Sequence, residues 1–348
     1  MELKTKKIIY LISILSLSTF LLLILSILAF LEISKVNKDD INSKKIVATT
    51  TMLGDLSKQL TKGTNFQVQT LMTTGVDPHN YQAKPSDLRH IISADLIVTN
   101  GLHLEAQMQK AFKTLCQGKN NHQCKFFSAA DDSYLSPDEI ITGDKGVYAD
   151  PHIWFSINLW QKVCKSLKEK IIEIIEPKAV DKSEIKTKID ENFEDYNRKL
   201  EDLTKDIKKK ITETNFEQKE VYLITAHDAF SYLCLFLNEI QDQNNKKEFI
   251  LEPIQGISTQ DEASASRILE LIPIIKEKGV KAIFTESSVP ENTIQSLKEN
   301  AVDFVKIVSP TKDNEEDILY SDSLNKENDY IKTFEHNIEI IFKYLGKN

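Results

Sequence analysis

Residues 183–212 read SEIKTKIDENFEDYNRKLEDLTKDIKKKIT, and this stretch decides how the rest of the chain is organised. Its apolar side chains recur at steps of three and four residues, which places them on one face of an amphipathic helix. They are Ile185, Ile189, Phe193, Tyr196, Leu200, Leu203, Ile207 and Ile211. Asp181 or Ser183 is the expected N-cap. We therefore predict one continuous helix that ends near Thr212 and is about 45 Å long, at a rise of 1.5 Å per residue.

A helix of this length exceeds those of most domains. Its heptad-like spacing is also typical of a coiled coil, but a stretch of about four heptads does not require a partner chain. We favour a spine that packs against both halves of a two-lobed monomer.

Strand-like runs alternate with helical ones on both sides of this spine. Before it, strands are predicted within KKIVATTTML (44–53), FQVQTLMTTG (66–75) and DLIVTNGLHLE (95–105), and a helix capped by Ser86 within KPSDLRHIISA (84–94). After it, strands are predicted within EVYLITAHDAF (220–230), VKAIFTESS (280–288) and AVDFVKIVS (301–309), and a closing helix within YIKTFEHNIEIIFKYL (330–345). Such strand–helix–strand units favour parallel sheets with helices on both faces. The predicted fold class is therefore α/β, with two lobes that each hold a parallel sheet with flanking helices, joined by a single long backbone helix.

The predicted organisation has five parts. They are an N-terminal signal peptide or signal anchor (1–33), a linker (34–44), an N-terminal α/β lobe (45–157), a helical region with the long helix (158–214) and a C-terminal α/β lobe (215–348).

The N-terminal segment indicates export. Residues 8–31 carry no charge and follow Lys4, Lys6 and Lys7, and 24 residues are enough to span a bilayer core as a helix. A secretory apolar region is usually only about 7–15 residues long, so we favour a signal anchor over a cleaved signal peptide. No cysteine follows the apolar run, which argues against a lipid anchor. The chain from about Ile41 is therefore predicted to lie in the periplasm or at the cell surface, anchored in the cytoplasmic membrane by residues 8–31.

Composition excludes some partners. The 348 residues are 41% hydrophobic, which is ordinary for a folded protein of two domains, and carry a net charge of −8. There is no basic patch for nucleic acid, and only three arginines are present to clamp phosphates or carboxylates. A small cation suits this balance better than a polyanion.

The four cysteines fit an oxidising compartment. Cys116 and Cys124 flank a polar loop that a disulfide would close, with two free thiols as the alternative. Cys164 and Cys234 lie among apolar residues and are predicted to be buried. No C-x-x-C pattern occurs, so a cysteine zinc site or a thioredoxin-like site has no support.

Three of the seven histidines lie where a strand gives way to a turn or helix. Asp-Pro-His occurs twice, ending in His79 and in His152, and His227 follows the strand in LITAHDAFSYL (223–233). Proline stops strand pairing and turns the chain, and open α/β sheets bind ligands at the carboxyl ends of their strands. Asp322 in ILYSDSL (318–324) again follows an apolar run. Three imidazoles and a carboxylate suit zinc, and also manganese or iron, so these four residues form the predicted metal site.

A family resemblance adds to this reading. GVDPHNYQAKPSD, NGLHLE, DPHIWFS, AHDAFSYL, QGISTQDEASASRILEL, AIFTESSVPENTIQSL and LYSDSL occur in this order. Together they resemble the metal-binding lipoproteins and periplasmic proteins that serve zinc and manganese ABC transporters, above all the treponemal zinc/manganese-binding branch. The resemblance covers nearly the whole exported region. It implies an ion held between two lobes by three histidines and one aspartate, at positions that match His79, His152, His227 and Asp322.

The resemblance also implies the function. It makes the chain the substrate-binding component of a transition-metal importer, with Zn or Mn, and Fe as a further option, as cargo for a membrane permease. The manganese-only branch usually has glutamate in place of His227, and dedicated zinc members carry a histidine-rich loop that is missing here. The metal preference is therefore left open. Transport, rather than enzyme activity, is the expected role.

Two other functions are compatible with a predicted metal site. An extracytoplasmic zinc-dependent hydrolase would need an open coordination position for water, which Asp322 would fill, and no H-E-x-x-H motif is present. A surface adhesin with incidental metal would need exposed apolar patches. Since ligating imidazoles must be neutral, metal affinity is expected to weaken below their ordinary pKa of about 6.5.

The remaining acidic residues and histidines receive simpler interpretations. Asp77, Asp150 and Asp228 each neighbour a predicted ligand, where turn capping is at least as well supported as orientation of the imidazole. For Glu286, helix capping is favoured over contact with the site. His103 and His336 are expected to support packing or the surface, and His90 and His122 to be exposed.

Overall fold

The computed structural model describes residues 19–20, 22–27, 43–116, 124–131, 133–143, 148–175, 182–242, 246–259, 264–290, 294, 297, 305–311 and 316–347. The chain divides into two compact units, Met1–Lys44 and Lys45–Asn348. In the first unit, residues 19–20 and 22–27 are helical. None of the helices within the described ranges combines the length and apolar character needed to cross a membrane, and most of the predicted segment 8–31 lies outside these ranges.

The N-terminal lobe is built on a parallel sheet with strand order β2-β1-β3-β4. Its strands are β1 (Lys45–Ala48), β2 (Gln67–Thr70), β3 (Leu96–Thr99) and β4 (Lys125–Ser128), and its helices are α2 (Thr51–Thr61), α3 (Pro85–Ile92) and α4 (Gln109–Cys116). A short 3-10 helix, η1 (Ala106–Met108), leads into α4.

Alternate side chains of the central strands enter different cores, as the period-two geometry of a strand requires. Ile46 and Val98 join the core that contains α2, whereas Val47 and Ile97 pack with the side chains of α3 and α4. Both faces of this sheet are therefore covered, which explains why its central strands are apolar throughout.

The C-terminal lobe repeats this plan with strand order β6-β5-β7-β8, again all parallel. The strands are β5 (Glu220–Thr225), β6 (Glu248–Pro253), β7 (Ala282–Phe284) and β8 (Lys306–Val308). The helices are α7 (Ser231–Glu239), α8 (Ala265–Glu277) and α10 (Tyr330–Leu345). One face of the sheet packs on α8 through Leu271 and Ile275, and the other joins the core that holds α7 and α10.

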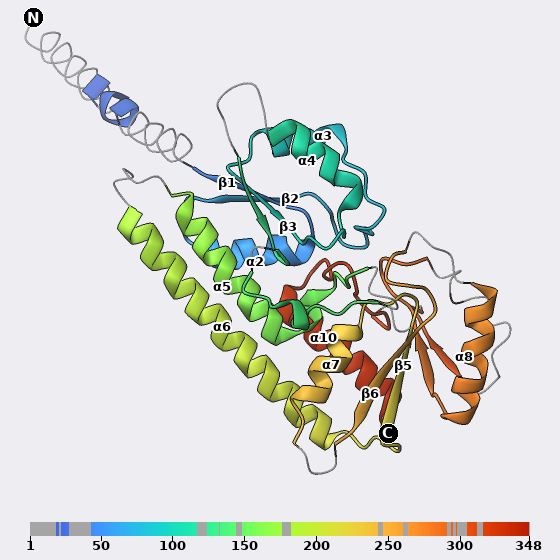
Figure 1. The fold of residues 1–348 in the computed structure, drawn as a ribbon. Coiled ribbons are helices and arrows are strands. Elements are labelled where there is room, and N and C mark those ends of the chain that lie inside the picture. The colour runs from blue at the N-terminus through green and yellow to red at the C-terminus, as the bar shows by residue number, and fades with distance from the viewer. Residues whose placement is uncertain are drawn as a thin grey trace, which may run out of the picture. The chain divides into compact units, whose positions relative to one another are not determined.

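Two helices connect the sheets, α5 (Ile157–Glu173) and α6 (Lys182–Glu213), and they run side by side in Figure 1. The 32-residue α6 contacts α2 of the N-terminal lobe and α10 of the C-terminal lobe. Seven of the eight residues on its predicted apolar face are buried, and Phe193 is half-buried against the same core. The predicted fold of two α/β lobes joined by a long helix is confirmed. The predicted boundaries at 157/158 and 214/215 stay a prediction.

Several local predictions were wrong. The edge strands β4 and β6 were not predicted. Ser86 is not the cap of α3; that helix begins at Pro85, and the Asp87 carboxylate accepts the N–H of the capping residue Lys84 at 2.7 Å. Ser183 lies inside α6 rather than at its cap, and Asp181 is outside the described residues.

The cysteine predictions are tested only in part. Cys164 and Cys234 are free and buried, as predicted. The side chain of Cys116 lies outside the described residues, so its bridge to Cys124 stays a prediction.

Candidate metal centre

Four side chains from distant parts of the chain meet at one point. His79, His152, His227 and Asp322 each offer an atom able to bind metal, and these atoms all lie within 4.8 Å of one another. All four residues are buried, and none is more than 4% exposed. The residues chosen from the sequence are therefore brought together by the fold.

His79 and His227 lie shortly after strands, at their carboxyl ends, whereas His152 and Asp322 lie farther along the chain from β4 and β8. His79 lies in the turns after β2, and His152 immediately precedes the 3-10 helix η4 (Ile153–Phe155), downstream of β4. His227 comes two residues after β5, and Asp322 lies in a bend after β8. The N-terminal lobe thus supplies two imidazoles, and the C-terminal half of the chain supplies an imidazole and the carboxylate. Parallel sheets place their ligand sites at this edge, which is why the strand ends predicted the location.

The spacing between the side chains suits a single small cation. The Nε2 atoms of His79 and His152 are 3.4 Å apart. Asp322 bridges the two other imidazoles, since its Oδ1 lies 3.3 Å from His152 Nε2 and its Oδ2 lies 3.3 Å from His227 Nε2. Atoms that each lie about 2 Å from a zinc ion in a tetrahedral shell are separated by distances of this order.

Two carboxylates contact the Nδ1 atoms of His152 and His227 and so orient these two imidazoles. Asp150 Oδ1 lies 2.7 Å from His152 Nδ1 and also accepts the backbone N–H of His152 at 2.9 Å. Glu286 Oε2 lies 2.6 Å from His227 Nδ1, and its Oε1 accepts the His227 N–H at 3.0 Å. A carboxylate on Nδ1 keeps the proton on that nitrogen and leaves Nε2 free to bind metal.

These contacts show what Asp150 and Glu286 do. Asp150 combines turn capping with orientation of the ring. The prediction that Glu286 caps a helix was wrong, because both of its oxygens face His227. The sheet register explains why: Thr225 pairs with Phe284, so residues two positions beyond each of them end side by side.

The other two aspartates have the simpler role. Asp77 Oδ1 accepts the backbone N–H of His79 at 2.8 Å, and its Oδ2 accepts the hydroxyl of Thr259 at 2.6 Å. Asp77 therefore fixes the turn that carries His79 and ties it to the C-terminal lobe. Asp228 accepts the hydroxyl of Ser231 at 2.8 Å in the first turn of α7.

The charges of the site shift its pKa values in opposite directions. Burial lowers the pKa of His79 to about 4, so this imidazole is neutral at pH 7. Burial also opposes protonation of His152, but the charges of Asp150 and Asp322 outweigh it and raise the pKa to about 9.

Burial and neighbouring charges also have opposite effects on the pKa values of His227 and Asp322. Burial disfavours the charged form of His227, but Glu286 and Asp322 raise its pKa well above the ordinary value. Burial would raise the pKa of Asp322, yet the neighbouring His227 and His152 hold it well below its ordinary value. The raised pKa values of His152 and His227 therefore favour positive charge beside the buried carboxylates in the absence of metal.

Several polar atoms at this point are buried without a hydrogen bond. Both oxygens of Asp322 and Nε2 of His227 are among them. A buried polar atom with no partner is costly, and oxygen and nitrogen atoms that converge in this way fit a cation. If all four side chains bound one ion, three nitrogens and one oxygen would complete a four-coordinate shell and leave no position for the activated water that a zinc hydrolase needs.

The remaining histidines lie away from the site. His90 and His103 are exposed, as predicted for His90. Nε2 of His336 lies 2.9 Å from the carbonyl of Ile318, which makes it the hydrogen-bonded packing residue that was predicted. His122 is outside the described residues.

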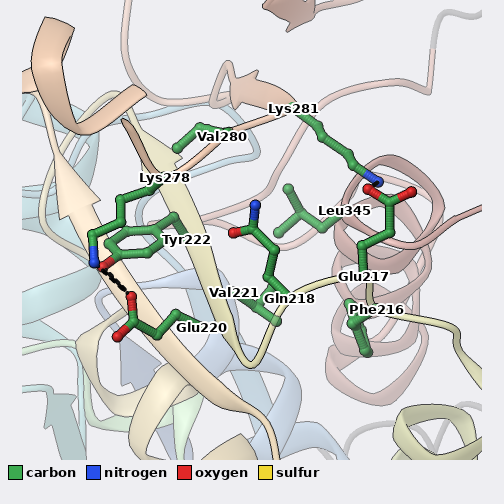
Figure 2. A pocket seen from close by; sticks show the side chains of 11 residues that line it. Phe216, Glu217, Gln218, Glu220, Val221, Tyr222, Lys278, Val280, Lys281 and Leu345 are labelled. Carbon is green, nitrogen blue, oxygen red and sulfur yellow. Dashed lines mark hydrogen bonds and ion pairs between the residues drawn. The ribbon is translucent and has the colours of Figure 1, made fainter. Parts of the chain in front are cut away.

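A pocket at the opposite edge of the C-terminal sheet offers a contrast (Figure 2). It lies where β5 and β7 begin, has a volume of about 30 Å³, and is lined by Glu217, Glu220, Lys278 and Lys281 among others. Lys278 pairs with Glu220 at 2.8 Å and Lys281 with Glu217 at 3.0 Å. Because these lysines and glutamates already pair with one another, they do not indicate an ion site in this pocket.

Comparisons with known proteins agree with this geometry. The profile of one family, described as zinc-uptake complex component A, periplasmic, matches residues 46–344. The chain is 31% identical to the manganese-binding lipoprotein MntA of Bacillus subtilis over 305 residues, which cover 86% of this chain and 89% of that protein. It is 26% identical over 290 residues to the manganese ABC transporter substrate-binding lipoprotein PsaA of Streptococcus anginosus, covering 82% and 86%. The solved structure of the periplasmic zinc-binding protein TroA from Treponema pallidum matches with a TM-score of 0.72 and 26% identity, covering 88% of this chain and all of that one.

Proposed function

This chain belongs to the family of zinc-uptake complex component A, and from this premise we propose that His79, His152, His227 and Asp322 hold the ion that it carries. It is the extracytoplasmic metal-binding component of an ABC importer and not an enzyme. The observation that carries the ligand assignment is the convergence of these four buried side chains within 4.8 Å.

The cargo is a divalent transition metal, Zn or Mn, and the same donor types also accept Fe. Three nitrogens and one oxygen favour zinc in affinity, because zinc outranks manganese at a given site. Elemental analysis of protein purified from its own host without added metal tests this. One zinc or manganese ion per chain is expected. A protein that carries neither ion, and takes up neither when supplied, would contradict the proposal.

Delivery requires a membrane partner. A permease that receives the ion from a monomeric binding protein is the partner that suits this function. We place the protein at the outer side of the cytoplasmic membrane through residues 8–31, although the relatives MntA and PsaA are named lipoproteins. Cys116 and Cys124 are proposed to form a disulfide, which this oxidising compartment permits.

The long helix limits how the site can open. Because α6 packs against α2 and α10 at once, it couples the two lobes as one rigid strut. We expect only a small tilt between metal-free and metal-bound forms. Solution scattering of both forms measures this: the radius of gyration should change little, and a change typical of a wide hinge closure would contradict the strut.

A further inference from the structure

Asp322 lies on a segment without regular secondary structure, residues 321–324, which we call the aspartate strap. Its carboxylate oxygens lie 3.3 Å from the Nε2 atoms of His152 and His227, and its backbone N–H has only a long contact of 3.4 Å to Ser288 Oγ. The two imidazoles are also candidate ligands, so once an ion occupies the site they no longer donate to the carboxylate. Its position then depends on the backbone around it, to which Ser288 also contributes through a 3.1 Å contact between its hydroxyl and that of Ser321.

The strap is held at both ends by the N-terminal lobe, although it belongs to the C-terminal half of the chain. Before Asp322, the indole N–H of Trp154 donates to the carbonyl of Ser321 at 2.9 Å. After it, the N–H of Leu324 donates to Thr51 Oγ1 at 2.7 Å, and the hydroxyl of Thr74 donates to the carbonyl of Leu324 at 2.9 Å.

Trp154 joins the strap to a second ligand. It lies two residues after His152, its ring meets the His152 ring edge-on at 5.2 Å, and it is 3% exposed. Its own carbonyl accepts the hydroxyl of Tyr330 at 2.6 Å. Because a peptide group is planar, a donor that fixes the carbonyl of Ser321 also fixes the N–H and Cα of Asp322. The position of its Cα in turn limits the directions in which the Asp322 side chain can extend.

We propose that Trp154 is a positioning residue for metal binding: its indole N–H holds the Ser321–Asp322 peptide so that the carboxylate meets the ion. This inference rests on the proposed function, because it concerns the same site. The competing account is that Trp154 only fills the core. Phenylalanine distinguishes the two, since it keeps an aromatic ring and removes the N–H.

The chain provides a matched control in Trp160. This residue is also buried, and its indole N–H donates to Tyr196 on α6 at 3.3 Å rather than to the strap; its ring stacks on Tyr330 at 5.2 Å, a contact that an aromatic replacement can keep. Trp154→Phe and Trp160→Phe therefore remove the same donor from two buried positions. Thermal unfolding of both metal-free variants records their general loss of stability.

The test uses zinc and cobalt(II) as probes. Trp154→Phe should release zinc to a chelator at least about tenfold faster than the wild type, in the range seen when outer contacts of a ligand are lost. Its cobalt(II) d–d absorption bands should move toward those of Asp322→Ala. Trp160→Phe should match the wild type in both measurements, even if its metal-free form melts equally early.

The outcomes separate this inference from the function on which it rests. If Asp322→Ala alters the cobalt(II) bands and Trp154→Phe does not, the positioning role is wrong and the metal site stands. If Asp322→Ala leaves the bands unchanged, the proposed ligand set itself fails. Should Trp154→Phe not fold, 3-benzothienylalanine at position 154 replaces the indole N–H by sulfur in a ring of nearly the same shape, and unchanged zinc release in that protein would overturn the inference.

Discussion

The two edges of the C-terminal sheet carry charged pairs under opposite conditions. At the amino edge, Glu220 and Lys278 meet at 2.8 Å, with side chains 40% and 44% exposed. At the carboxyl edge, Glu286 and His227 meet at 2.6 Å with side chains that are fully buried. Water screens the first pair, so it contributes little to stability. Burial of the second pair costs solvation energy, and the attraction between its two side chains can be too small to offset that cost.

The difference indicates what the carboxyl edge is for. Three buried carboxylates, from Asp150, Glu286 and Asp322, surround three imidazoles there, and the Asp322 oxygens have no hydrogen-bond partner. Such an arrangement is stable only with a positive charge among the side chains, supplied either by protons or by a metal ion. The buried charge, rather than the volume of a cavity, therefore marks the functional edge of this sheet.

The largest expected effect comes from removing the shared carboxylate. Asp322→Ala should weaken zinc binding by more than the roughly 10- to 100-fold loss that is typical of outer contacts. The reason is that Asp322 faces both His152 and His227 at 3.3 Å. Competition with a chelator of known affinity measures the change. Unchanged affinity would show that the buried charge at this edge has a purely structural origin.

Acidification should have the next largest effect. Bound imidazoles are neutral, whereas the metal-free protein holds a proton on His152, whose pKa is raised to about 9, and on His227, whose pKa is raised well above its ordinary value. Affinity should therefore fall as the pH drops below about 9, by about tenfold per pH unit for each proton displaced. His79, with its pKa near 4, adds a further loss only in strong acid.

Calorimetry in buffers of different ionisation enthalpy tests this directly. Zinc binding at pH 7 should release between one and two protons from the protein. Heats that do not depend on the buffer would mean that neither imidazole is protonated in the metal-free state, and the affinity loss would then begin only near the ordinary histidine pKa of about 6.5.

A smaller effect is expected from Glu286→Gln. The change removes the charge behind His227 and turns an amide toward its Nδ1, while leaving all four ligands in place. Zinc affinity should fall by about 10- to 100-fold. The same chelator competition measures it, and a loss as large as that of Asp322→Ala would mean that Glu286 itself contacts the ion.

The sequence predicted the four residues that converge because their positions are a property of topology. His79 and His227 follow strands, and strand ends can be recognised from apolar runs and turn residues. The missed strands β4 and β6 have the sequences KFFS and EFILEP, and neither alternates clearly between apolar and polar residues.

Contacts between strands and lobes depend on information that one sequence does not contain. Glu286 reaches His227 because of the register between β5 and β7, which pairs Thr225 with Phe284. Trp154 reaches the carbonyl of Ser321 only when the two lobes are packed. The converging residues were therefore predictable one at a time, but the groups that contact them from outside the cluster were not, since each of those contacts is set by tertiary structure.

The smallest effect should come from the same substitution at the other edge. Glu220→Gln breaks an exposed pair with Lys278 and should lower Tm by less than about 3 °C. Zinc affinity should be unchanged, because Glu220 lies at the far end of β5 from His227 and water screens its charge. Together with Glu286→Gln, this variant separates local contacts from the general field of a protein with net charge −8. If both substitutions weakened zinc binding equally, long-range attraction would govern affinity. The burial of the Glu286–His227 pair would then have no special role in metal binding.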